Sequence, residues 1–102
     1  MGATLFFEVA PGRTAVKAFA NAYVEARYEH GRRPYSGTIA EKDDVLVIEE
    51  AGRMSEAQAR EFARQLIDSG DSRIRSKAAP AGAIPLVDRD EPTWLLFGVA
   101  AS

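Results

Sequence analysis

Chemically capable side chains gather in one short run of the sequence, GRRPYSGTIAEK, at residues 31–42. The run carries guanidinium, hydroxyl, phenol, carboxylate and ammonium groups, and a histidine comes directly before it. Convergent groups of this kind orient polar small molecules or the polar rim of a protein partner. The candidate ligand-binding or partner-binding residues are therefore His30, Arg33, Tyr35, Ser36, Thr38, Glu41 and Lys42.

The length of this run limits how many of its groups can meet. A strand advances about 3.3 Å per residue, so the two ends would lie of the order of 30 Å apart if the run were extended. Alternation places Ser36, Thr38 and Lys42 on one face, and Tyr35 and Ile39 on the other. Two interpretations stay open. Either the first set lines a polar groove on a helix-free face of the sheet, or the run is an ordinary strand.

Other reactive groups give no clear catalytic or metal site. The chain has no cysteine and one histidine, which excludes disulfides, zinc ribbons and thiol chemistry. His30 stands at the end of a predicted helix, where an imidazolium suits the helix dipole. Acidic pairs at 43–44, 49–50 and 88–90 are typical of turns and strand ends. We expect no catalytic residue, no metal and no cofactor; whether the chain is an enzyme stays open, with the balance against it.

Composition and charge restrict the class of partner. The chain has 102 residues, 46% of them hydrophobic, and a net charge of -2, which predicts one globular domain over residues 1–102. Apolar runs are too short to span a membrane and no signal peptide is recognised, so we expect a cytoplasmic protein without a membrane contact. The acidic balance argues against nucleic acid, and we interpret Arg73, Arg75 and Lys77 as a solvated basic face.

Two amphipathic helices are predicted. The first runs from an N-cap at Thr14 to Gly31 and has an apolar stripe. The second has a capping box formed by Ser55 and Gln58, and Gly70 closes it. The expected buried stripes are Val16, Phe19, Ala20 and Tyr23 in the first helix, and Ala59, Phe62, Ala63 and Leu66 in the second.

The predicted strands complete an α+β fold. ATLFFEVA at 3–10 is one strand, PYSGTIAEK and VLVIEE at 34–42 and 45–50 form a hairpin, and WLLFGVAA at 94–101 is the last. The order predicts a ferredoxin-like βαββαβ domain, with an antiparallel sheet and both helices on one face. AIPLV at 83–87 would add an edge strand, because Pro85 cannot donate to a ladder.

The last strand also suggests self-association. WLLFGVAA is apolar on both faces, and helices on one side of the sheet would cover only half of it. A symmetric homodimer would bury the remainder. The alternative is that residues 71–93 fold back over the open face as a lid.

Four blocks carry a resemblance to a known group: YEHG, YSGTIAEK, PAGAIPL and the ending FGVAAS. Together they resemble small proteins of tailed phages and related bacteria that share Tyr-Ser/Thr-Gly-Thr-Ile-Ala-Glu-Lys and a terminal Phe-Gly-x-Ala-Ser. The resemblance implies a phage or mobile-element setting and transfers no activity. We therefore expect a small non-catalytic binding protein that acts through protein contact, as a phage-encoded modulator of a host process; the alternative is a small-ligand binder or enzyme with a polar site around residues 30–42.

Overall fold

The computed structural model describes residues 2–31 and 35–102 and shows an α+β fold. Its helices are α1 (Ala15–His30) and α2 (Glu56–Asp68). Its strands are β1 (Ala3–Pro11), β2 (Val45–Val47), β3 (Ala81–Pro85) and β4 (Thr93–Ala101), with short 3₁₀ turns η1 (Ile39–Glu41) and η2 (Glu49–Ala51). The predicted fold class is confirmed. No helix in these residues combines the length and apolar character needed to cross a membrane.

The four strands form one mixed sheet in the order β1-β4-β3-β2. β4 pairs antiparallel with β1 and β3, whereas β2 pairs parallel with β3. The sheet therefore differs from the all-antiparallel ferredoxin-like arrangement, and the predicted hairpin of 34–42 with 45–50 is wrong. Residues 39–41 turn into η1 instead, because the Thr38 hydroxyl accepts from the Ala40 N–H and stabilises that turn.

β3 lies inside the sheet, although AIPLV was expected at an edge. Pro85 is the last residue of β3, so the missing N–H interrupts no later pairing. Its carbonyl accepts from the Met54 N–H at 3.2 Å, which joins the end of β3 to the segment before α2.

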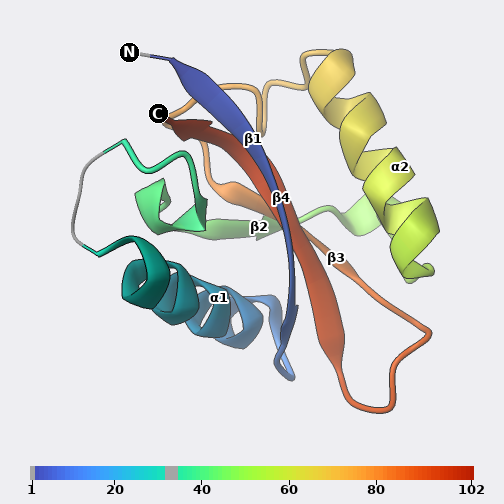
Figure 1. Ribbon diagram of the computed structural model, residues 1–102. Helices are drawn as coiled ribbons and strands as arrows, with labels where there is room; N and C mark the ends of the chain where they lie inside the picture. The colour runs from blue at the N-terminus through green and yellow to red at the C-terminus, as the bar shows by residue number, and fades with distance from the viewer. Residues whose placement is uncertain (1, 32–34) are drawn as a thin grey trace.

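The two helices lie on opposite faces of the sheet, as Figure 1 shows, and not on one face as predicted. α1 packs with Phe6, Ala83 and Leu96, whereas α2 packs with the residues that point the other way, including Leu95 and Phe97. Because β4 is apolar on both sides, each side needs its own cover. Both faces of β4 are buried within one copy, which removes the reason for expecting a face-to-face dimer.

α1 turns a different side to the sheet from the one predicted. Its start at Thr14 and its end at Gly31 are confirmed. The buried residues, however, are Ala15, Ala18, Ala22 and Ala26. Val16 is 67% exposed, and Phe19 and Tyr23 are only partly buried. Small side chains let the helix backbone approach a sheet surface that is already filled by Phe6 and Leu96.

α2 is close to the prediction. The capping box is present, with the Ser55 hydroxyl accepting from the Gln58 N–H and the Gln58 side chain accepting from the Ser55 N–H. Ala59 and Ala63 are buried, as expected, and Phe62 and Leu66 are partly buried at the margin of the same cluster.

Candidate functional site

The polar run after α1 forms a hydrogen-bonded loop. The backbone N–H and the hydroxyl of Ser36 both donate to Glu41 Oε2, at 2.9 and 2.8 Å. Ser36 Oγ and Thr38 Oγ1 are 2.9 Å apart and share a further hydrogen bond. Partial burial would raise the pKa of Glu41, but the hydrogen bonds from Ser36, together with the Tyr35 backbone and the charge of Arg27, hold the pKa below its usual value. Three candidate binding residues are thus partners of one another.

This loop is attached to the ends of β1 and β4. The Gly37 N–H donates to the Ala101 carbonyl at 2.8 Å, and a Cβ at Gly37 would lie 3.2 Å from Thr4. Gly37 has φ 72°, so glycine suits both the conformation and the space. Ile39 is fully buried. Tyr35, by contrast, keeps its side chain 55% exposed and is available for contact.

Lys42 is a buried residue and does not line an open face of the sheet. Its side chain is 2% exposed, and Nζ donates to the carbonyls of Lys77 and Ala79 at 3.0 and 2.7 Å, with that of Ser76 at 3.5 Å. Burial lowers the pKa of Lys42. The predicted groove on a helix-free face is therefore wrong, because α1 and α2 occupy both faces. Lys42 instead holds the segment 76–79 against the core.

The structure brings only two of the predicted residues to a common cleft. His30 and Thr38 line a cleft of about 80 Å³ between β1 and α1. Ser36, Glu41 and Lys42 do not line it, and Lys42 instead borders a groove on the other side of α1. Arg33 lies outside the described residues. A binding role for the predicted set stays a prediction, but its described members do not share one cavity.

The same cleft carries acidic residues that the sequence analysis did not select. Glu8 of β1 faces Glu25 and Glu29 of α1 across it, and these three residues define the acidic cleft. Partial burial, followed by repulsion from Glu25 and Glu29, raises the pKa of Glu8. No group of three or more His, Cys, Asp or Glu side chains among the described residues is placed to hold a metal ion.

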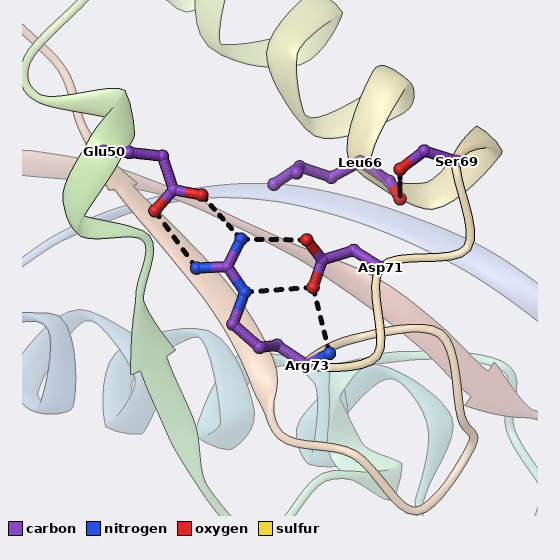
Figure 2. Close-up of polar contacts among 5 residues, drawn as sticks. All are labelled: Glu50, Leu66, Ser69, Asp71 and Arg73. Atoms are coloured by element: carbon purple, nitrogen blue, oxygen red, sulfur yellow. Dashed lines mark hydrogen bonds and ion pairs between the residues drawn. The ribbon is translucent and has the colours of Figure 1, made fainter.

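The basic cluster at 73–77 is partly neutralised by an ion-pair network, which Figure 2 shows. The Arg73 guanidinium donates to Glu50 through Nη1 and Nη2 at 3.0 and 2.6 Å, and to Asp71 through Nε and Nη2, both at 2.9 Å. Ser69 Oγ donates to the Leu66 carbonyl just before this network. The network joins the segment after α2 to η2, so the role of Arg73 is structural.

β1 forms one of the two edges of the sheet, and the side of β1 away from β4 has no strand partner in the described chain. β1 pairs only with β4, and the flanking Gly2–Ser102 and Gly12–Pro92 hydrogen bonds show that even-numbered residues face β4. The odd-numbered residues therefore turn their backbone groups outward. Asn21 Nδ2 donates to the Pro11 carbonyl at the end of the strand. The remaining outward residues form what we call the outer edge: Ala3, Leu5, Phe7 and Val9.

The two sides of the outer edge differ in charge: one is acidic and the other carries charges of both signs. On the α1 side lies the acidic cleft. On the α2 side lies a shallow groove of about 290 Å³, lined by Phe7 together with Arg60, Glu61 and Arg64. The Arg64 guanidinium stacks on the Phe7 ring at 5.5 Å from its centroid. The run ATLFFEVA has neither Lys nor Pro, and this feature of the sequence could have indicated an unprotected edge strand.

Comparisons of the chain with models of protein families, with curated proteins and with solved structures find no match. The functional argument therefore depends on the surfaces described above, and chiefly on the outer edge of β1.

Proposed function

We propose that this chain is a small non-catalytic binding protein that acts through protein contact, and that its outer edge pairs with an extended segment of the partner. The observation that carries the proposal is the unpaired backbone from Ala3 to Val9 at the border of the sheet. An extended peptide that adds a strand to such an edge gains main-chain hydrogen bonds without any preformed pocket.

β1 carries one charged side chain, Glu8, but lacks most of the features that usually protect an edge strand. Natural proteins block edges with lysines, internal prolines, bulges or short strands. β1 has nine residues in an unbroken register with β4, and its proline stands at the end. Hollows on both sides of the strand leave room for the side chains of an added strand. These observations together support pairing in preference to an inert edge.

The small-ligand alternative has less support. A ligand site needs several groups that converge on one cavity. Ser36 is hydrogen-bonded to Thr38 and to Glu41, and the Lys42 ammonium group donates its hydrogen bonds to backbone carbonyls. These polar groups are therefore already paired within the protein. The resemblance of YSGTIAEK to small phage proteins supports the further proposal that the chain is phage-encoded and modulates a host process, with a cytoplasmic host protein as its partner.

The test is selection of peptides from a random library on the parent protein and on Leu5→Pro. The Leu5 N–H points outward, so proline removes an outer-edge donor and leaves the β1–β4 hydrogen bonds in place. Leu5→Ala is the matched control, because it shortens the same side chain and keeps the donor. Circular dichroism establishes that all three proteins are folded.

We expect selected peptides to bind the parent and Leu5→Ala similarly, and Leu5→Pro at least ~10-fold more weakly, which corresponds to about 1.4 kcal/mol. Amide exchange at Leu5 and Phe7 should slow when such a peptide binds. If no peptide is enriched, or if enriched peptides bind Leu5→Pro as well as the parent, the outer edge is not the binding surface.

A further inference from the structure

A strand added to the outer edge would present its side chains alternately to two different surroundings. Successive residues of a strand point to opposite faces of the sheet. Those on one face would enter the acidic cleft beside α1, and those on the other would enter the groove beside α2. Binding to the outer edge can therefore depend on the charge pattern of the partner's side chains as well as on main-chain hydrogen bonds to the partner.

The α1 side favours basic side chains. Glu8, Glu25 and Glu29 face one another across the acidic cleft, and each is exposed at its rim. His30 is the basic group that lines the same cleft, and the Asn21 side chain is already hydrogen-bonded to the Pro11 carbonyl. A lysine or arginine from an added strand would relieve the mutual repulsion of three carboxylates that one imidazole does not balance.

The α2 side favours aliphatic or acidic side chains. Its floor is the Phe7 ring, which offers an apolar contact. Arg60 is engaged by Glu56 at 2.8 Å, whereas Arg64 lies over the Phe7 ring. Glu61 lines the same groove, so the aliphatic contact with the ring is the main one, and a carboxylate is accommodated only on the side of the exposed Arg64 guanidinium.

Resting on the proposed function, we infer that the outer edge of β1 selects extended peptides with Lys or Arg at alternate positions, which enter the acidic cleft, and aliphatic or acidic residues between them. The partner is thus a protein segment with a basic strand face. A second copy of this chain fits less well. Two-fold pairing of two outer edges keeps like faces together, so it would set acidic cleft against acidic cleft and Arg64 near Arg64.

The experiment compares two synthetic peptides of the same composition, acetyl-TKVKEKVKT-amide and acetyl-TKKVEVKKT-amide. The first places all its lysines on one face of a strand, and the second divides them between the two faces. Binding is measured by titration calorimetry at low ionic strength and again at high salt. We expect the parent protein to bind the alternating peptide at least ~10-fold more tightly, and the difference to shrink as salt screens the charges.

Charge-reversal variants locate the selectivity. Glu25→Lys with Glu29→Lys should remove the preference for the alternating peptide. The double variant should instead favour acetyl-TEVKEKVET-amide, in which glutamates replace the first and last lysines of the alternating pattern. Asp43→Lys is the matched control, because Asp43 lines the groove on the other side of α1 and should leave the preference unchanged.

The outcomes separate this inference from the proposed function. If the parent binds both lysine peptides equally and Leu5→Pro weakens both, the outer edge binds peptides but does not read charge, and only the inference is overturned. If Leu5→Pro has no effect on either peptide, the proposed function also fails. A protein mass that is doubled without peptide and restored to the monomer value by Leu5→Pro would assign the outer edge to a second copy and overturn the inference.

Discussion

At the scale of single residues, Lys42 shows how far a side chain's role depends on distant backbone. Its ammonium group is buried and bonded to the carbonyls of Lys77 and Ala79. We predict that Lys42→Met, which keeps most of the stem but removes the donors, lowers the free energy of unfolding by about 1–3 kcal/mol. Urea denaturation measures the loss.

Lys77→Met is the control for this substitution, since it removes the same charge from an exposed side chain and should change stability by less than about 0.5 kcal/mol. Equal stability of Lys42→Met and the parent would mean that the three carbonyls do not depend on the ammonium group.

The ion pairs of Arg73 predict how the stability of the fold depends on pH. Hydrogen bonds from the Arg73 side chain lower the pKa of Asp71 to about 2 from its usual 3.8. A carboxyl with a lowered pKa stabilises the fold above its usual pKa, and that contribution is lost as the pH falls to the folded value. Arg73→Gln should therefore show a shallower loss of stability than the parent between about pH 4 and pH 2.

Urea midpoints at several pH values across this window measure the two slopes. Arg75→Gln, an exposed neighbour with the same charge change, should keep the parental slope. If Arg73→Gln and the parent lose stability in parallel, the network contributes nothing to acid sensitivity.

Hydrogen bonds between residues close in the sequence were predictable, and those between distant residues were not. Thr14 at the start of α1 and the Ser55–Gln58 capping box were both foreseen, because their partners lie three residues away. The acceptors of Lys42 lie 34 to 37 residues further along the chain, and no spacing rule points to them. The outer edge of β1 was missed for the same reason, since an edge is defined by which strands pair.

At the scale of elements, α1 has two stripes that periodicity alone cannot separate. Both the alanine set and the Val16 set recur at helical spacing, and the sequence analysis chose the larger side chains. We predict that Ala18→Leu, which adds volume at a fully buried contact with the sheet, lowers the free energy of unfolding by about 1–3 kcal/mol. Val16→Ala, at an exposed position, should change it by less than about 0.5 kcal/mol.

Thermal and urea denaturation of the two variants compare the stripes directly. The orientation of α1 described above requires the larger effect at Ala18. The opposite ranking, with Val16→Ala the more damaging change, would mean that the helix buries the stripe that was predicted from hydrophobicity.

Strand pairing was the least predictable part of the fold. The runs at 3–10 and 94–101 were recognised, because apolar strand patterns and β-branched residues are local. The run at 45–50 was recognised only in its first half, since β2 ends at Val47 and Glu49 and Glu50 belong to η2. The partners of these strands were not recognised, because β2 joins β3 across α2 and a long connection. A parallel pair needs such a crossover, whereas neighbouring runs with a short turn favour the hairpin interpretation.

At the scale of the whole molecule, the three layers explain the apolar last strand. Leu96 faces α1, Phe97 faces α2, and both are fully buried within one copy. A glutamate at either position would therefore act on folding and not on a dimer interface. The argument for a homodimer built on this strand therefore no longer holds. In the described structure, the surface that remains suited to self-pairing is the outer edge.

Charge opposes pairing of two outer edges, so we predict a monomer at low ionic strength up to tens of micromolar. The acidic clefts of two copies would meet, and repulsion between exposed charges decays over a Debye length of about 10 Å at 0.1 M salt. Light scattering across a concentration series should therefore give the monomer mass at low salt. Glu25→Gln with Glu29→Gln should increase the mass and Asp43→Asn should not, because only the first pair lines the acidic cleft. Adding Leu5→Pro to the double variant should restore the monomer, since it removes an outer-edge donor; a doubled parental mass at low salt that Leu5→Pro leaves unchanged would place self-association on another surface.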